Sequence, residues 1–364
     1  MRKRTGAHLI LIILTVVLTA ASAPCFVCYG DTGSSFEYKY YKYPVMYDKA
    51  LERTMNDVYN DFAGKKYDDK TMPIPGLIET RIETGGVSSS SNQYVPQGMC
   101  RAGDYMLITA YDVKKKHNSV IYAVDMNGMT LVSTLTMPNR FHAGGIACDG
   151  ENIWMTGETS DKYKGDPFVQ YMTYETFLGH LDEPVSEVEE SELSRYIYIK
   201  NKPSFLEYDN GRLWVGTYAG RKNTSDAYMY GYEIIGEPGN RRLNTLMYSI
   251  IAGLDTSAQG ADIAGDYLYV SSSYNSASRM KTSFITKYNL RRSDTGTGNY
   301  LVEGHEMKRV EVPKMNEELV IDGSTLYINF ESGASHWRYA LIRTDRVLAL
   351  DLSLWGRQKM KEVR

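Results

Sequence analysis

The sequence is poor in the residues that build metal centres and disulfide frameworks. It has 4 cysteines and 6 histidines in 364 residues. Cys25 and Cys28 precede the globular part, so their C-x-x-C spacing is a weak redox or zinc signal. No histidine pair has zinc-ligand spacing, and no G-x-S-x-G segment marks a nucleophilic serine. The sequence therefore predicts no metal site and no cofactor, and it identifies no catalytic residue.

An excess of charge of one sign is also lacking. The formal net charge is −3, and 23% of the residues are charged. Nucleic acids and anionic membrane surfaces attract strongly basic proteins. The composition therefore predicts no nucleic-acid partner and no electrostatic membrane surface.

The N-terminal segment, residues 1–30, is typical of an export signal. Arg2, Lys3 and Arg4 precede an apolar run, and Ala21-Ser22-Ala23 is a small-residue cleavage pattern. The low-polarity stretch 9–30 is also long enough for a membrane anchor, which needs ~20 residues. We expect either a secreted protein or one anchored by this segment, with the bulk of the chain outside the cytoplasm.

Residues 31–75 differ from the rest of the chain. A polar and aromatic leader covers residues 31–43. Apolar residues then recur at helical spacing over residues 46–62, which predicts an amphipathic helix. A polar linker, residues 65–75, follows. At the other end of the chain, residues 356–364 form a basic tail.

From residue 76 onward the sequence consists of short strands and turns, and one segment recurs. A pair of small or polar residues precedes a glycine turn and an apolar strand, as in YVPQGMCRAGDYMLITAY (residues 94–111). The pairs begin at spacings of 47, 60, 55 and 58 residues, at Gln97, Gly144, Ser204, Gln259 and Glu317. Repeats of ~40–50 residues with up to four short strands are typical of a β-propeller.

We therefore predict an all-β fold, a β-propeller over residues 76–355, with the helical segment as an N-terminal extension. Five copies indicate five blades, and a sixth could lie within the long second unit, residues 144–200. We take the apolar strand of each copy as the innermost strand. Trp154 and Trp214, at matching positions, should pack between blades. Residues 76–84 should supply the fourth strand of the last blade, after strands at 339–343 and 346–352, and leave no free sheet edge.

Several segments together resemble a group of largely uncharacterised secreted bacterial propeller proteins, within the broad YVTN and lactonase-like fold. They are VPQGM, NSVIYAVDMNG, HAGGIACDGENIW, NKPSFLEYDNGRLWVGTY, AQGADIAGDYLYVSSSY and LYINFESGA. The resemblance covers roughly residues 76–352 and implies a propeller outside the cytoplasm. It carries over no activity. Five-bladed lectins and glycosidases share such a fold, but a fold does not determine function.

The pairs that precede the apolar strands predict a polar collar at the mouth of the central channel. Its members are Gln97, Ser204, Gln259 and Glu317, with His142 able to reach over the glycines of the second copy. The collar could bind a small polar ligand such as a sugar or peptide end. It could equally satisfy backbone groups and channel waters, as buried polar groups must.

The opposite ends of the apolar strands supply secondary channel positions, Tyr111, Glu158, Tyr218 and Glu331, with Ser273 in the fourth copy. Glu331 could bind Ca²⁺, a cation that prefers oxygen ligands, although we favour a structural role. A glycosidase needs two carboxylates across a pocket. We expect Glu317 and Glu331 to lie at different levels, too far apart for this.

Three functions stay open. We favour a non-catalytic propeller that binds a small polar ligand, a glycan or a partner protein at the channel mouth. A lactonase-like or glycosidase-like hydrolase using His142 and Glu317, with Ca²⁺ as a possible cofactor, is the first alternative. A structural role in assembly at the cell envelope is the second. Cys100 and Cys148, in adjacent repeats, could form a disulfide or remain buried free thiols.

Overall fold

The computed structural model describes the propeller region of the chain and two short strands before it. The described residues are 26–28, 38–40, 71–159, 165–219, 228–254, 256–273, 283–292, 300–302, 308–338, 340 and 343–352. The predicted helix at 46–62 and the basic tail at 356–364 lie outside them. So does the predicted export segment, apart from β1 (Phe26–Cys28), which pairs with β2 (Tyr38–Tyr40). Within the described part, no helix has the length and apolarity needed to cross a bilayer.

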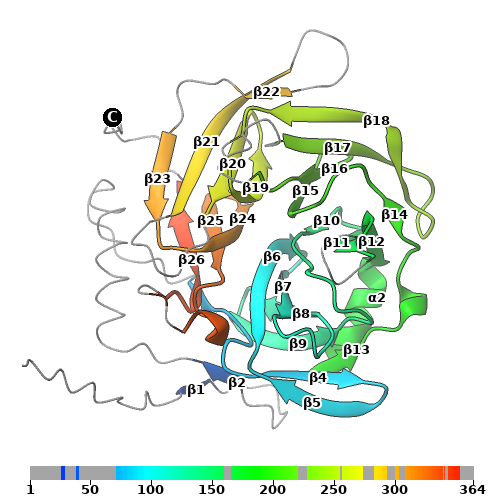
Figure 1. Cartoon of the computed structure of the whole chain (residues 1–364), viewed down its shortest axis with the longest axis vertical. Coiled ribbons are helices and arrows are strands. Elements are labelled where there is room, and N and C mark those ends of the chain that lie inside the picture. The colour runs from blue at the N-terminus through cyan, green and yellow to red at the C-terminus, as the bar shows by residue number, and fades with distance from the viewer. Residues whose placement is uncertain are drawn as a thin grey trace, which may run out of the picture.

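The described chain forms five antiparallel blades around a central axis, which confirms the predicted five-bladed β-propeller (Figure 1). In the first four blades the strands follow one another outward from the axis in chain order, whereas the outermost strand of the fifth comes from the N-terminal side of the chain. The first blade consists of β6 (Tyr94–Ala102), β7 (Tyr105–Asp112), β8 (Val120–Asp125) and β9 (Thr130–Thr136).

The next two blades follow the same order. The second contains β10 (Ile146–Cys148), β11 (Asn152–Glu158), β12 (Pro167–Thr173) and β14 (Ile197–Tyr198). The third contains β15 (Phe205–Asp209), β16 (Arg212–Gly216), β17 (Tyr228–Ile235) and β18 (Arg242–Ala252).

The last two blades complete the ring. The fourth contains β19 (Ala258–Ala264), β20 (Tyr267–Ser272), β21 (Ser283–Arg292) and β23 (Lys308–Val312). The fifth contains β24 (Asn316–Asp322), β25 (Thr325–Phe330), β26 (Arg346–Asp351) and β3 (Met72–Pro73). A further strand, β22 (Tyr300–Val302), pairs with both β21 and β18 and so joins the third and fourth blades.

The long second repeat contains an insertion and not a sixth blade. Between β12 and β14 the chain forms α2 (Tyr174–Gly179), η1 (His180–Asp182), β13 (Val185–Glu187) and η2 (Glu190–Glu192). β13 pairs in parallel with β9 and so extends the first blade.

The ring closes through the N-terminal side of the chain, as predicted, but with different residues. Met72 pairs with Val347 of β26, and Ile74 N donates to the carbonyl oxygen of Asp345 (2.9 Å). Met72 and Ile74 are fully buried. At Gly76 the backbone takes a positive φ of 73° and turns away from the blade. The predicted closing strand, residues 76–84, is therefore wrong.

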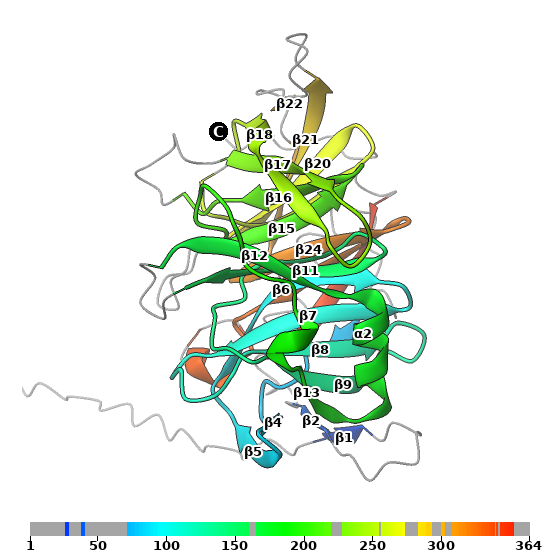
Figure 2. The same ribbon diagram turned by 90° about the vertical axis from the view of Figure 1, so that its right-hand side faces the viewer.

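The segment after that turn forms a separate hairpin, β4 (Thr80–Thr84) and β5 (Val87–Ser91). It lies beside the outer strands of the first blade, near β9 and β13 (Figures 1 and 2). Glu83 N donates to Thr136 Oγ1 (3.2 Å), and Gly85 N donates to Glu187 Oε2 (2.6 Å). The strand predicted at 339–343 is not seen at its described residues, 340 and 343.

The innermost strand of each blade is not the apolar strand that the repeats suggested. The sheet order places β6, β10, β15, β19 and β24 at the axis, and the apolar strands such as β7 come second. Glycines let neighbouring inner strands approach closely. A Cβ on Gly145 would lie 2.5 Å from Leu206 N, and one on Gly260 would lie 2.6 Å from the Cα of Glu318. Close packing of the inner strands thus explains the repeated glycine.

Hydrophobic side chains fill the space between blades. Trp154 packs in one core cluster with Leu206 and Tyr232 of the third blade. Trp214 packs in another with Ala258 and Leu268 of the fourth. The predicted inter-blade role of the two tryptophans is confirmed.

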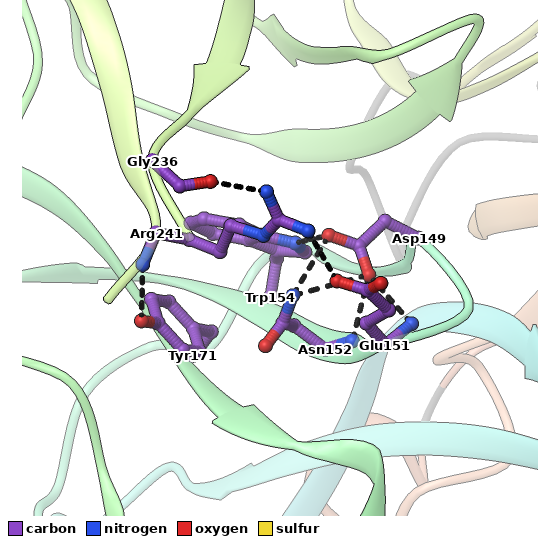
Figure 3. Close-up of polar contacts among 7 residues, drawn as sticks. All are labelled: Asp149, Glu151, Asn152, Trp154, Tyr171, Gly236 and Arg241. Atoms are coloured by element: carbon purple, nitrogen blue, oxygen red, sulfur yellow. Dashed lines mark hydrogen bonds and ion pairs between the residues drawn. The ribbon is translucent and has the colours of Figure 1, made fainter. Parts of the chain in front are cut away.

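Polar contacts also join the second and third blades (Figure 3). Asp149 Oδ1 accepts hydrogen bonds from the backbone N–H groups of Glu151 (2.9 Å) and Asn152 (2.6 Å). Asp149 Oδ2 accepts a hydrogen bond from Trp154 Nε1 (2.7 Å). Arg241, in the β17–β18 loop, pairs with Glu151 (2.5 Å), and its backbone N–H donates to Tyr171 Oη (2.8 Å). The turn after β10 is thereby fixed to the next blade.

Candidate functional site

The strand order brings the two predicted sets of site residues to one face of the propeller. In each blade the inner strand and the second strand form an antiparallel hairpin, so the start of one lies opposite the end of the other. Asn316 pairs with Phe330 in the fifth blade, and Val95 pairs with Tyr111 in the first. The expectation that Glu317 and Glu331 lie at different levels is wrong, because the hairpin returns the chain to its starting level.

A pocket of about 520 Å³ lies on this face. All nine predicted collar and secondary positions line it: Gln97, Tyr111, His142, Glu158, Ser204, Tyr218, Gln259, Glu317 and Glu331. Gly144 lines it as well. Ser273, by contrast, is buried and is not among the lining residues.

Sequence reasoning missed other lining residues. They are Ala143, Thr156, Gly157, Lys202, Pro203, His336 and Trp337. Lys202 could have been found, because it precedes Ser204 by the same offset at which His142 precedes Gly144. His336 and Trp337 lie in the short helix η4 (Ser335–Trp337), in the connection between β25 and β26 of the fifth blade.

β-Bulges direct the collar side chains. The register of the inner strand shifts between Pro96 and Met99, between Ala258 and Gly260, and between Asn316 and Leu319. Gln97, Gln259 and Glu317 lie within these three irregular stretches. A bulge bends its strand and re-aims a side chain, so three inner strands present a polar group to the pocket.

A chain of polar contacts crosses the pocket floor. Gln259 Nε2 donates to Glu317 Oε1 (3.2 Å), and Trp337 Nε1 donates to Glu331 Oε2 (3.0 Å). The carboxyl groups of Glu317 and Glu331 meet between these two donors. Their side chains are 5% and 3% exposed. The floor therefore holds two buried carboxyl groups in direct contact.

These carboxyl groups hold protons more tightly than free glutamates. Burial raises the pKa of Glu317 well above its usual range, and the charge of Glu331 and a hydrogen bond with it raise the pKa further. Burial raises the pKa of Glu331 to about 7, although hydrogen bonds with Trp337 and Glu317 oppose the rise. Two carboxylates in contact cannot both ionise easily. Near neutral pH the pair therefore shares at least one proton.

One wall of the pocket holds an ion pair and a neutral imidazole. Lys202 Nζ lies 2.9 Å from Glu158 Oε1. The His142 ring packs against Tyr111, with 4.5 Å between ring centroids. Burial, followed by the positive charges of Lys202 and Lys115, lowers the pKa of His142 to about 4. His142 is therefore uncharged at neutral pH.

Aromatic rings line much of the rim. Tyr218 is 46% exposed, and Trp337 is half-buried beside His336, with ring centroids 4.5 Å apart. Together with Tyr111 they give the pocket several aromatic rings above an acidic floor. Tyrosine and tryptophan combine a large apolar face with a polar tip, which suits small amphipathic ligands.

Part of the collar has a structural role. Gln97 Nε2 donates to the carbonyl oxygen of Pro96 (2.7 Å), and the carbonyl oxygen of Gln97 accepts from Asn329 Nδ2 (2.8 Å). Gln97 thus connects the first and fifth blades. Among the described residues, no cluster of three or more histidine, cysteine or acidic side chains could hold a metal ion.

Further carboxyl groups tie inner strands to one another. Glu318 Oε1 accepts from Ala261 N (2.9 Å), and Asp262 Oδ2 accepts from Ile321 N (2.6 Å). The innermost strand is a sheet edge, and its unpaired N–H groups need acceptors. Burial raises the pKa of Asp262 to about 7 and that of Glu318 well above its usual range.

Cys100 and Cys148 are free thiols, so the disulfide alternative is not realised. Cys100 is buried and packs with Ala102 and Ile146, and Cys148 packs against the same cluster. Burial raises the pKa of Cys100 well above its usual range, and the nearby Cys148 raises it further. Both residues have the environment of structural thiols.

Comparisons with known proteins return structures but no family. No family model and no curated protein matches the chain. Similar structures include a nidogen/laminin complex, with 14% identity over 78% of this chain and 89% of that chain, at a TM-score of 0.37. Kuenenia stuttgartiensis hydrazine synthase has 11% identity over 74% and 90%, at 0.33. A mitotic checkpoint complex has 7% identity over 79% and 93%, at 0.38.

Proposed function

We propose that this protein binds a small polar ligand in the pocket at the channel mouth, without catalysing a reaction on it. One observation carries the proposal: residues from all five blades and from η4 converge on one pocket of about 520 Å³ with an acidic floor and an aromatic rim. Ligand pockets of small molecules typically measure ~300–1,000 Å³ and combine apolar walls with a few placed polar groups.

The proposed ligand is either a free small molecule or the end of a larger molecule. A glycan or a peptide terminus of a partner protein has the size and polarity that such a pocket accepts. Because residues 1–30 have the pattern of an export signal or anchor, we propose that the ligand is met outside the cytoplasm. Export is tested separately, by fractionating cells that express the full chain and a variant lacking residues 1–30.

The two buried carboxyl groups in contact, Glu317 and Glu331, form an acid pair that supports one alternative function. A carboxyl group that keeps its proton near neutral pH beside a carboxylate can act as general acid and general base, which favours the hydrolase alternative over the cell-envelope assembly role. The neutral imidazole of His142 could serve as a base. Turnover of lactone or glycoside substrates that is lost in Glu317→Gln and Glu331→Gln would establish this alternative.

Binding is tested with a matched pair of tyrosine variants. A library of sugars, amino acids and short peptides is screened against the full chain by ligand-observed NMR. Tyr218→Ala removes a ring on the pocket rim that is 46% exposed, whereas Tyr198→Ala removes a ring of β14 that is 55% exposed and does not line the pocket. We expect Tyr218→Ala to weaken binding about fivefold, since a stacked ring contributes ~1 kcal/mol.

Tyr198→Ala should bind like the parent protein. If hits exist but both variants bind them equally, the ligands lie elsewhere and the pocket assignment is wrong. If no compound of any class binds, the proposal of a small-ligand pocket fails.

A further inference from the structure

The charges on the pocket floor are not balanced by the described residues around them. Glu317 and Glu331 meet one another and take their other hydrogen bonds from Gln259 and Trp337, which are both neutral donors. Apart from its contact with Glu317, Glu331 Oε1 has no hydrogen-bond partner among the described residues. An acceptor so deeply buried normally finds a donor, so the floor lacks a donor that a ligand could supply.

Lys202, a cation that lines the pocket, is already paired with a carboxylate. Lys202 Nζ lies 2.9 Å from Glu158 Oε1. Glu158 therefore compensates the positive charge of Lys202. His142 stays uncharged near neutral pH because its pKa is lowered to about 4. The acid pair therefore contributes negative charge that the described wall does not compensate.

The rim suits a positive group. Tyr111, Tyr218 and Trp337 line the same pocket as the acid pair. The faces of such rings attract ammonium and guanidinium groups, most strongly where water is excluded. A neutral sugar could stack on the rings, but it would not compensate the negative charge of Glu317 and Glu331.

We propose, on the premise that this pocket is the ligand site proposed above, that its ligand carries an organic cation, an ammonium or guanidinium group. The positive group lies against Glu317 and Glu331 and donates to Glu331 Oε1, and the rim rings enclose its aliphatic part. When the cation binds, the shared proton of the acid pair is released to solvent, so that both carboxylates face the ligand. Binding and deprotonation are thereby linked.

Affinity for the cation should consequently increase with pH. Burial raises the pKa of Glu331 to about 7, so between about pH 6 and pH 8 this carboxyl group loses its proton and less free energy is spent on removing it when the cation binds. The titratable and charged groups that face or adjoin the pair belong to all the elements around the pocket: Glu317, Glu318, Glu331, Glu158, Lys202, His142 and His336. Of these, Glu317 and Glu331 are the groups that should govern the profile.

The test compares isosteres that differ in charge. n-Butylammonium is titrated into the full chain by calorimetry beside 1-butanol, its neutral counterpart, and n-butylguanidinium is titrated beside n-butylurea. We expect each cation to bind at least tenfold more tightly than its neutral partner. Titrations in phosphate and in HEPES, which carries no net positive charge, should reveal proton release, because the two buffers differ in ionisation enthalpy.

Variants of Glu331 and Glu317 test whether the cations bind at these two residues. Glu331→Gln should weaken binding of the cations at least tenfold and change the number of protons released on binding, while the neutral isosteres are unaffected. Glu317→Gln should also weaken binding of the cations, because it removes the second carboxylate from the pocket floor. Thermal unfolding of each variant shows whether it folds, and Tyr198→Ala serves as the folded control outside the pocket.

Three outcomes would overturn the inference. Equal binding of cations and isosteres would do so, as would unchanged cation binding in folded Glu331→Gln. The third is failure of every cation while a neutral compound binds in a manner sensitive to Tyr218→Ala. In this third case the pocket is still a ligand site, and only the cationic class is wrong.

Discussion

At the scale of single residues, the glycine that three of the five repeats share, at Gly98, Gly145 and Gly260, has a steric role that can be tested. A Cβ on Gly145 would lie 2.5 Å from Leu206 N and 2.7 Å from the backbone carbon of Phe205. Real Cβ atoms do not approach backbone so closely, so β10 and β15 must separate. We expect Gly145→Ala to lower the free energy of unfolding by ~1–3 kcal/mol, as overpacking of a core does, measured by urea denaturation.

Gly179 provides the matched control. It ends α2 with φ of −64°, and a Cβ there would meet nothing within 4 Å. Gly179→Ala should leave stability unchanged or raise it by ~0.4–1 kcal/mol, since alanine restricts the unfolded chain. If both variants unfold at the same urea concentration, close approach of the inner strands is not what requires the repeated glycine.

Most of the pocket residues could be predicted because they occupy equivalent positions in the repeats. Gln97, Gln259 and Glu317 share one aligned position, and the structure brings all of them to the pocket. Trp337 could not be found in this way, because η4 occurs in the fifth blade alone among the described repeats. The contact of Glu317 with Glu331 was missed for another reason, the wrong assignment of the innermost strand.

At the scale of the element, the error lay in which strand is innermost. The second strand β7, YMLITAYD, is apolar and largely buried, so it carries the strongest strand signal. The inner strand β6 contains Pro96, Gly98 and a bulge, which weaken that signal. Periodicity identifies strands but not their distance from the axis. Once the pair is seen as a hairpin, the contact of Glu317 with Glu331 follows from the register.

The closing strand β3 is the element whose contribution is easiest to isolate. Met72 is fully buried and lies in a core cluster that contains residues of the first and fifth blades, although β3 has only two residues. We expect Met72→Ala to cost ~2–5 kcal/mol, the usual range for a buried methionine reduced to alanine. Val87→Ala, in β5 at a site 66% exposed, should change stability by no more than ~0.5 kcal/mol.

Guanidinium denaturation of the full chain measures both variants. Similar midpoints for Met72→Ala and Val87→Ala would mean that the ring does not depend on closure by β3. The sequence indicated that the N-terminal side closes the ring, but two residues are too few for periodicity to locate.

At the scale of the whole molecule, the five-bladed ring could be predicted because its unit is repeated five times in the sequence. The electrostatics of the ring could not be predicted, because they depend on which strands lie next to one another at the axis. Glu318 and Asp262 each accept a backbone N–H from the inner strand of the adjacent blade. Such carboxyl groups replace the missing sheet partner at the axis, yet their burial favours the protonated form.

This burial makes the stability of the ring depend on pH. The pKa values of Asp262 and Glu331 are raised by burial to about 7, whereas unfolded Asp and Glu titrate near ~3.9 and ~4.3. Between these values the folded chain binds more protons than the unfolded chain. The stabilisation is therefore complete below about pH 4, decreases as the pH rises, and is lost above about pH 7.

We accordingly expect the contribution of these two groups to lower the unfolding midpoint steadily from about pH 4 to pH 7, measured by thermal and urea denaturation across that range. Asp262→Asn keeps an oxygen that can accept from Ile321 N but cannot ionise. Its midpoint should therefore fall less over the same range, and the difference between variant and parent should be largest at the upper end. A variant profile parallel to that of the parent would show that Asp262 does not couple protonation to closure of the ring, because the only property the substitution removes is the ability to lose a proton.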